Sequence, residues 1–252
     1  MEKIKEILLN LKDLGCSGVK VSFEDEGALY NEIITMRNLT TSVDLDLAIK
    51  IGGSEAKRDI VDCIDLNCDS IVGPMIESKF ALEKFIKSLD DYKYNKKRGF
   101  NLETITSYNN LNEISSLFDK IDYITFGRHD FVKSLYKNSE YVDDEEIYKI
   151  AENIFTLAKD KNKNCYIGGN VSVNSVNFIR RLINKNILDY FETRYIIFDT
   201  HKIKDLNKLD KLIKLALSFE YEWLKFIESR YLSYANKDNK RIKIIKDKIN
   251  NI

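Results

Sequence analysis

The chain has 252 residues, of which 32% are charged and 44% are hydrophobic, enough for a large core. Forty basic side chains balance forty acidic ones, so no net field draws the protein to nucleic acid or to anionic lipid. No run approaches the roughly 20 apolar residues of a membrane span, and residues 1–15 lack the apolar region of a signal peptide. We therefore expect a cytoplasmic protein with neither nucleic acid nor membrane as a partner.

Predicted strands and helices alternate along the chain as far as residue 200. The predicted strands cover residues 19–24, 47–53, 70–76, 99–104, 123–130, 165–170 and 195–200. The predicted helices cover residues 27–39, 54–67, 78–89, 110–119, 144–160 and 173–184. Such alternation is typical of a parallel sheet with helical crossovers. Because seven strands are one short of a closed barrel, we expect a further degenerate strand and an α/β fold, a (β/α)8 TIM barrel, over residues 1–204.

The alternative to the barrel is an open, doubly wound sheet. An open sheet gathers its ligand contacts at one switch point, usually with a glycine-rich phosphate loop. The glycine pairs Gly52-Gly53 and Gly168-Gly169 lack the GxGxxG spacing, which argues against nucleotide binding. Acids and small residues recur instead at the ends of several predicted strands, where barrels of this class place their sites. The pattern therefore favours the barrel.

Residues 205–252 are predicted to form a C-terminal helical extension. Apolar residues recur there at three-and-four spacing and form one aromatic-rich stripe. The stripe consists of Leu212, Ala216, Phe219, Trp223 and Phe226. Either packing on the barrel or contact with another subunit explains it, since aromatic surfaces are common at interfaces.

Cysteine and histidine usage argues against two other classes of site. The four cysteines show no CxxC spacing, which argues against a zinc site and against a disulfide framework in a chain of this size. We expect them to be buried as small hydrophobic side chains. Only His129 and His201 are present, and no GxSxG sequence holds a serine nucleophile, so a Ser-His-Asp hydrolase is not expected.

Two predicted strands carry a carboxylate near their end, Glu103 in one and Asp130 in the other. Because side chains alternate faces in a strand, Asn101 shares a face with Glu103, and Arg128 shares one with Asp130. On adjacent barrel strands the two acids would converge. A divalent cation such as Mg²⁺ typically takes one or two carboxylates and leaves its other positions to water and substrate. The alternative is that each acid caps the helix that follows it.

Basic residues occur in the same set of predicted strands. Lys50 lies in the middle of an apolar strand, where a lysine is costly to bury unless it pairs with acids or a bound anion. Lys20 shares a strand face with Ser22 and Glu24. The predicted result is a charged cluster inside a barrel mouth of cationic character, made of Lys20, Glu24, Lys50, Glu103, Arg128 and Asp130. A purely structural ion-pair network is the alternative.

Five short segments follow one another in a distinctive order: VSFEDEGA (21–28), AIKIGGSEAKRD (48–59), SIVGPMIES (70–78), FNLETITSYNNLNEI (100–114) and ITFGRHDF (124–131). In order and spacing they resemble the HpcH/HpaI aldolase and citrate lyase β-subunit family. The family's comparable segments are an acidic strand end of the type L-E-D-A, a strand bearing a basic residue, a V-x-P-K/M-V-E segment, a V-E-T strand and a G-x-x-D-L segment. The resemblance covers about residues 18 to 200.

The resemblance implies a (β/α)8 barrel that uses Mg²⁺, or a similar ion such as Mn²⁺, to make or break a carbon–carbon bond next to a carbonyl. By position, Glu103 matches the glutamate of V-E-T and Asp130 the aspartate of G-x-x-D, which are the family's metal ligands. Glu24 and Asp25 match the acidic pair near the site, and Glu77 matches an acid for which we expect a supporting role. The resemblance also implies a homo-oligomer formed through C-terminal helices.

The sequence departs from the family pattern at three points. Lys50 stands where the family usually has an arginine that stabilises the enolate oxygen, and a lysine supplies a point charge without a bidentate fork. The sequence GRHD replaces the small residues common before the aspartate, so Arg128 is expected to contact a substrate carboxylate or phosphate. No match to the family's coenzyme A contacts is found, which argues against a thioester substrate.

The resemblance therefore implies a divalent-metal-dependent carbon–carbon lyase of the aldolase type, acting on a small 2-oxo acid or related carbonyl compound through an enolate. Lys50 or Arg128 would add positive charge beside the enolate oxygen, and Glu24 or His129 would move the proton. The residues expected to bind substrate are Lys20, Asp25, Arg128 and Gly52.

Two alternative functions stay open at this point. A Schiff-base aldolase would use Lys50 or Lys20 to attack the carbonyl without a metal, since burial and neighbouring cations lower the pKa of a lysine. A non-catalytic barrel would serve as a binding or assembly subunit. Glu192 and Arg194, just before the last predicted strand, have no assigned role.

Overall fold

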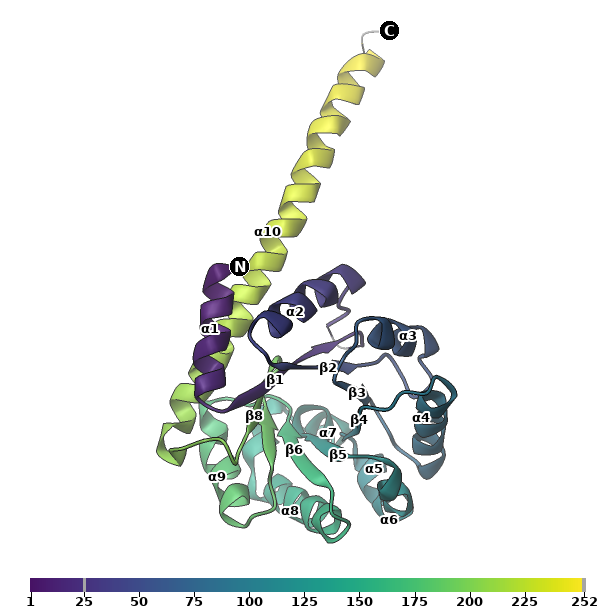
Figure 1. The fold of residues 1–252 in the computed structure, drawn as a ribbon, viewed down its shortest axis with the longest axis vertical. Coiled ribbons are helices and arrows are strands. Elements are labelled where there is room, and N and C mark those ends of the chain that lie inside the picture. The colour runs from purple at the N-terminus through teal and green to yellow at the C-terminus, as the bar shows by residue number, and fades with distance from the viewer. Residues whose placement is uncertain (25, 251–252) are drawn as a thin grey trace.

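A closed eight-stranded barrel forms the centre of the protein, of which the computed structural model describes residues 1–24 and 26–250 (Figure 1). The strands are β1 (Cys16–Ser22), β2 (Asp46–Lys50), β3 (Ser70–Gly73), β4 (Lys97–Leu102), β5 (Tyr123–Gly127), β6 (Asn164–Gly168), β7 (Tyr190–Glu192) and β8 (Ile196–Asp199). The predicted barrel is confirmed, and the strand that the sequence pattern missed is the three-residue β7.

Helices surround the barrel (Figure 1). The α-helices are α1 (Glu2–Asp13), α2 (Tyr30–Ser42), α3 (Lys57–Asp65), α4 (Lys79–Asp91), α5 (Ile105–Asn109), α6 (Leu111–Ile114), α7 (Arg128–Ser134), α8 (Glu145–Asp160), α9 (Val176–Asn184) and α10 (Leu209–Asn250). Short 3-10 helices are η1 (Ser115–Lys120), η2 (Ser139–Asp143), η3 (Val173–Ser175) and η4 (Leu206–Lys208). The apolar core lies mainly between the helices and the outer face of the strands. All four cysteines are buried there as free thiols, as expected.

The last strand departs from the predicted parallel sheet. Strands β1 to β7 pair in parallel, whereas β8 pairs antiparallel with both β7 and β1. A turn of three residues, 193–195, joins β7 to β8 where a regular barrel has a helix. This turn therefore lies at the C-terminal end of the parallel strands, and Asp199 lies at the opposite end.

An aspartate precedes each of β3, β5 and β7 and joins it to the strand before it. In each case the main-chain N–H of the aspartate donates to the carbonyl of one residue in the preceding strand. The N–H of that strand residue donates in return to the carboxylate of the aspartate. The three pairs are Asp69 with Leu47 (2.8 and 2.9 Å), Asp122 with Arg98 (2.9 and 2.7 Å) and Asp189 with Cys165 (3.0 and 2.7 Å). These reciprocal hydrogen bonds fix the register of alternate strand pairs at the N-terminal end of the barrel.

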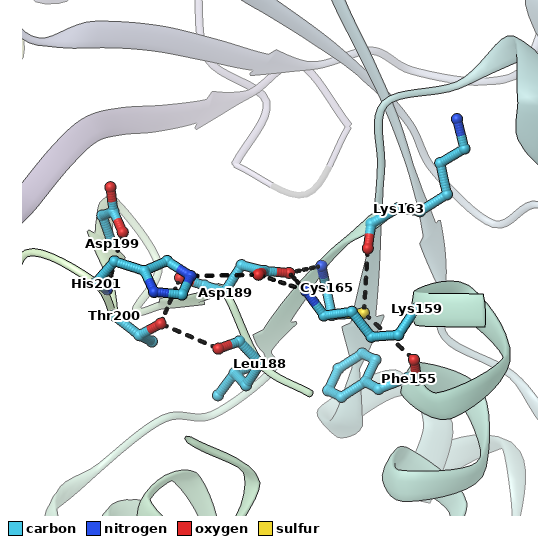
Figure 2. A network of polar contacts seen from close by, with 9 residues as sticks. All are labelled: Phe155, Lys159, Lys163, Cys165, Leu188, Asp189, Asp199, Thr200 and His201. Carbon is cyan, nitrogen blue, oxygen red and sulfur yellow. Dashed lines mark hydrogen bonds and ion pairs between the residues drawn. The ribbon is translucent and has the colours of Figure 1, made fainter. Parts of the chain in front are cut away.

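The third of these aspartates also anchors the reversed strand (Figure 2). Asp189 is 6% exposed, and its carboxylate accepts hydrogen bonds from Lys159 Nζ at 2.5 and 2.6 Å. His201 Nε2 lies 3.4 Å from Asp189 Oδ1, and Thr200 Oγ1 lies 3.0 and 2.8 Å from the carbonyl oxygens of Leu188 and Asp189. The residues that follow β8 are thus bound to the start of β7.

A thin apolar layer fills the middle of the barrel. It consists of Ala48, Val72, Tyr123, Tyr166 and Ile197, with Tyr190 packed against it. Polar and charged side chains line the barrel at its C-terminal end instead. The interior therefore changes from apolar to ionic within two residues along β2, from Ala48 to Lys50, and along β7, from Tyr190 to Glu192.

Helix α10 is 42 residues long and has two different halves. The predicted stripe is buried from Leu212 to Trp223, and Phe226 is partly buried, so this half packs on the chain's own barrel. Lys3 pairs with Glu222 at 2.7 Å and joins α1 to α10. Residues 231–250 are all exposed, and Figure 1 shows this half extending away from the barrel. Among the described residues, no helix is long and apolar enough to cross a membrane.

Candidate active site

A cavity of about 380 Å³ lies at the C-terminal end of the barrel. Side chains from the ends of the strands, from the β7–β8 turn and from α10 line it. The lining residues are Lys20, Ser22, Glu26, Lys50, Asn101, Glu103, Thr125, Gly127, His129, Asp130, Gly169, Asn170, Val171, Glu192, Thr193, Arg194, Leu217 and Glu220. This end of the barrel is where enzymes of this architecture hold their catalytic groups.

Glu103 lies directly after β4 and is 2% exposed. Its Oε1 accepts a hydrogen bond from the N–H of Met75 at 2.9 Å, and its Oε2 accepts one from Asn101 Nδ2 at 2.9 Å. Burial raises the pKa of this carboxyl and Asp130 raises it further, whereas Lys50 and the two hydrogen bonds lower it. Helix α5 is capped by Thr104, whose Oγ1 accepts from the N–H of Ser107, so Glu103 is not a helix cap.

Asp130 comes from the first turn of α7, because β5 ends at Gly127. Strand alternation therefore does not apply to residues 128–130. Both His129 and Asp130 line the cavity. His129 Nδ1 is buried and has no hydrogen-bond partner among the described residues.

Lys50 is buried at the end of β2, with 7% of its surface exposed. Its Nζ lies 2.7 Å from Glu24 Oε2. Glu24 does not line the cavity and reaches it only through this ion pair. Lys50 also lies close enough to Glu103 to lower the pKa of that carboxyl. The predicted pairing of a buried lysine with acids is therefore present.

Two further ion pairs border the cavity. Lys20 pairs with Glu192 at the end of β7, and Arg194 Nε in the β7–β8 turn lies 3.3 Å from Glu26 Oε1. Glu26 Oε2 also accepts the N–H of Ser22 at 2.7 Å. The turn that reverses the last strand thus supplies ionic side chains to the cavity.

Two glycines allow the backbone to come close to the acids. A Cβ on Gly127 would lie 2.9 Å from both Cβ and Oε2 of Glu103. Gly169 has a φ of +79°, and a Cβ there would lie 2.4 Å from the backbone nitrogen of His129. A larger residue at either position would displace Glu103 or the start of α7.

The cavity is richer in acids than the sequence suggested. Its lining holds five carboxylates, Glu26, Glu103, Asp130, Glu192 and Glu220, against three cations, Lys20, Lys50 and Arg194. Burial raises the pKa of Glu220 as well, with Arg194 opposing it. The prediction of a cationic mouth is corrected by this excess of carboxylates, which instead suits a bound cation.

Arg128 does not contact the cavity, which corrects the prediction that it touches the substrate. Its side chain is fully buried and pairs with Asp143. Its Nε donates to the carbonyl of Gly168 at 3.1 Å, and its Nη2 lies 3.3 Å from Ser175 Oγ. The guanidinium also lies over the Phe178 ring. Arg128 therefore ties α7 to β6 and α9 behind the cavity wall.

Three other predicted residues have different outcomes. Gly52 lies outside the cavity, and its N–H donates to Asp59 Oδ2 at 2.6 Å, so it does not reach a substrate there. Asp25 lies outside the described residues. Glu77 Oε1 accepts a hydrogen bond from Thr104 Oγ1 at 2.7 Å, which is a supporting contact directly beside Glu103.

Glu103 and Asp130 are the residues that fit a divalent cation. Within the described chain no cluster of three or more His, Cys, Asp or Glu side chains is arranged to hold a metal. Two carboxylates suffice for Mg²⁺ when water and substrate supply the remaining oxygens. Burial disfavours the ionised form of Glu103 and raises its pKa, and a cation in this acid-rich cavity would favour the ionised form.

Sequence reasoning missed the contributions of Glu192, Arg194 and Glu220. The first two were noticed without a role because the three-residue β7 has too few residues for an alternating pattern. Glu220 lies on α10 and lines the cavity although it is more than a hundred residues away from Glu103 in sequence. The only signal for Glu220 as a cavity residue is its half-buried position on the packed half of α10.

Comparisons with known proteins support the shared fold. No protein-family model and no curated protein matches the sequence. An HpcH/HpaI aldolase from Desulfitobacterium hafniense DCB-2 superposes with a TM-score of 0.61 at 10% identity, over 77% of this chain and 82% of that one. An HpcH/HpaI aldolase/citrate lyase family protein from Burkholderia cenocepacia J2315 gives 0.61 at 10% identity, over 75% and 82%.

A third solved structure, the citrate synthase SbnG, superposes with a TM-score of 0.62 at 12% identity, over 88% of this chain and 89% of that one. At these identities the likeness concerns the fold. The barrel implied by the sequence motifs is thus found in solved proteins that carry the same family names.

Proposed function

We propose that this protein is a divalent-metal-dependent carbon–carbon lyase of the aldolase type, acting on a small 2-oxo acid or related carbonyl compound through an enolate. The observation that carries the proposal is the pair of acids, Glu103 and Asp130, in one acid-rich cavity at the C-terminal end of the barrel. The fold shared with HpcH/HpaI aldolases supports the same reaction class.

Glu103 and Asp130 would hold Mg²⁺ or Mn²⁺. When bound, such an ion supplies positive charge beside the substrate carbonyl oxygen and so favours the enolate. Met75 N–H and Asn101 Nδ2 orient the Glu103 carboxylate before any ligand arrives, because each donates to one of its oxygens. Thr104 and Glu77 hold the backbone beside it.

Lys50 adds a second positive charge near the same acids. Its ion pair with Glu24 keeps the ammonium at the cavity wall, and burial excludes competing water. Lys20 and Arg194, held by Glu192 and Glu26, would bind the charged end of the substrate. His129 is the proposed proton carrier, since it lines the cavity with an unpartnered ring nitrogen, whereas Glu24 is engaged by Lys50.

A Schiff-base aldolase is the second candidate, and one observation favours it. Lys50 is a buried lysine that lines the cavity, as a carbonyl-attacking amine requires. Its ion pair with Glu24 opposes this role, because a neighbouring carboxylate keeps an ammonium protonated.

Cleavage of 4-hydroxy-2-oxo acids tests the proposal, and the release of pyruvate measures it. We expect activity with Mg²⁺ or Mn²⁺, loss of activity in EDTA and recovery when the metal is restored. Borohydride added with pyruvate distinguishes the alternative, because it would trap a covalent adduct on Lys50 that mass spectrometry detects. Such an adduct with activity in EDTA would overturn the metal proposal, and neither activity nor adduct would favour a non-catalytic binding barrel.

We further propose that the exposed half of α10 pairs with a second copy of the chain. Apolar side chains recur there at three-and-four spacing, as in a two-helix seam. These are Ile242, Ile245 and Ile249, each at least 38% exposed. Because residues 242–250 are all exposed, a second α10 is the partner with matching spacing.

A further inference from the structure

A second cavity, also of about 380 Å³, lies at the N-terminal end of the barrel. This end of a (β/α)8 barrel is normally a packed region that contributes stability. The lining residues are Lys12, Cys16, Ser17, Gly18, Asp44, Leu45, Asp46, Ala48, Ser70, Lys97, Tyr123, Tyr166, Tyr190, Ile197 and Lys202. A hollow of this size is within the range of small-molecule sites.

Three tyrosines from adjacent strands form one wall of this cavity. The rings of Tyr123 and Tyr166 lie 4.3 Å apart, and those of Tyr166 and Tyr190 lie 4.2 Å apart and nearly parallel. Gly99 makes room for the first ring, since a Cβ there would lie 2.2 Å from Tyr123. The small side chain of Ala48 leaves space in front of this wall.

The hydroxyl groups of this wall are only partly satisfied. Tyr123 exchanges a hydrogen bond of 2.5 Å with Ser70 Oγ. Tyr166 is 7% exposed, yet its hydroxyl makes no hydrogen bond to any described residue, and the half-buried Tyr190 hydroxyl makes none either. Burial raises the pKa of both phenols, so both keep their protons and are available as donors. Because both tyrosines line the cavity, their hydroxyls can donate to a ligand or to water that occupies it.

The charged side chains around this cavity occur in pairs. Its lining includes three lysines, Lys12, Lys97 and Lys202, and two aspartates, Asp44 and Asp46. Lys97 pairs with Asp46 at 3.1 Å, and Lys12 pairs with Asp44 at 3.0 Å. The third lysine pairs with Asp199, which is not part of the lining. Each lysine therefore has an acidic partner, and the hydroxyls of the tyrosine wall are the donors that a ligand would meet.

We propose that this cavity binds a small planar monocarboxylic acid, such as an aromatic one. Its carboxylate accepts hydrogen bonds from the Tyr166 and Tyr190 hydroxyls, and its flat body packs along the tyrosine wall. Among the described residues none lines both this cavity and the acid-rich one, so the two sites bind their ligands separately.

Calorimetry with benzoate as the probe, repeated by saturation-transfer NMR, tests this site on the full chain. We expect saturable binding that weakens about tenfold in Tyr166→Phe, which removes one donor and keeps the ring. Ala48→Leu should abolish binding by filling the space, and its far-UV circular dichroism will show whether the barrel is intact. Ser17→Leu is the second filling variant if Ala48→Leu does not fold.

Asp130→Asn is the matched control, because it changes the acid-rich cavity only and should leave benzoate binding unchanged. Cyclohexanecarboxylate, of similar size but puckered, should bind more weakly than benzoate. Absence of saturable benzoate binding, or equal binding by the parent protein and Tyr166→Phe, would overturn the proposal. Loss of binding in Asp130→Asn would assign the benzoate to the other cavity and overturn it as well.

Discussion

Glu103 shows how a single buried carboxyl can connect stability with function. Its position is fixed by hydrogen bonds to both oxygens, but burial works against its charge and raises its pKa. The folded protein therefore binds this proton more strongly than the unfolded chain does. Ionising Glu103 lowers the free energy of unfolding as pH rises from the ordinary carboxyl range, near pH 4.3, through the raised pKa.

Glu103→Gln should therefore stabilise the metal-free protein at neutral pH while removing activity. A gain of about 1 kcal/mol would raise the melting temperature by about 2–4 °C in a chain of this size. The gain should shrink toward pH 4, and Mn²⁺ should raise the melting temperature of the parent protein only. Thermal unfolding in EDTA and in Mn²⁺, with Asp119→Asn as an exposed control, measures this. Equal melting temperatures for parent and variant at neutral pH would contradict the account.

Individual residues also show where sequence reasoning succeeds. Lys20, Lys50, Glu103 and Asp130 were predicted from strand positions, and all four line one cavity. Arg128 was misplaced because β5 ends at Gly127, three residues before the end of the predicted strand at residue 130. Arg128 is instead the first residue of α7, and its guanidinium lies in the core beside Asp143. Strand alternation is a reliable guide only as far as the strand continues.

At the scale of elements, the order of strands was more predictable than their direction. Seven strands carry enough β-branched and aromatic residues to be recognised, whereas β7 has three residues and no period to detect. The reversal of β8 depends on contacts between Asp189, Thr200 and His201, which only the folded chain brings together. The ionic side chains of the β7–β8 turn could not be assigned for the same reason.

The aspartates that precede β3, β5 and β7 make a graded prediction about stability. Asp189→Ala should cost about 3 kcal/mol or more, because it leaves a buried N–H of Cys165 and the ammonium of Lys159 without their partner. Asp122→Ala should cost only about 1 kcal/mol, since Asp122 is exposed. Urea unfolding of both variants measures the difference. If both variants lost the same free energy of unfolding, burial of the aspartate would not determine how much this contact stabilises the protein.

At the scale of the whole molecule, α10 combines two roles along one helix. Its first half completes the core and adds Glu220 to the cavity, whereas residues 231–250 are all exposed and Tyr231 still donates a hydrogen bond to Glu32. Its 42 residues correspond to a length of about 63 Å. A helix that extends this far without packing gains most of its stability from a partner.

Removal of residues 231–252 should leave a folded barrel and lower the oligomeric state. Sedimentation velocity and far-UV circular dichroism on the full and shortened chains measure both effects. Ile242→Lys, Ile245→Lys and Ile249→Lys combined in the full chain form the matched control, because they change the seam without shortening the helix. A full-length protein that sediments as a monomer would contradict the proposed pairing.

The central claim is that Glu103 and Asp130 support metal-dependent enolate formation, and exchange of the pyruvate methyl protons tests it most directly. Proton NMR in heavy water would follow the methyl signal with Mg²⁺ or Mn²⁺, then with EDTA. The account predicts exchange that requires the metal and is lost in both Glu103→Gln and Asp130→Asn. Exchange that continues in EDTA, or that persists in both variants, would contradict it.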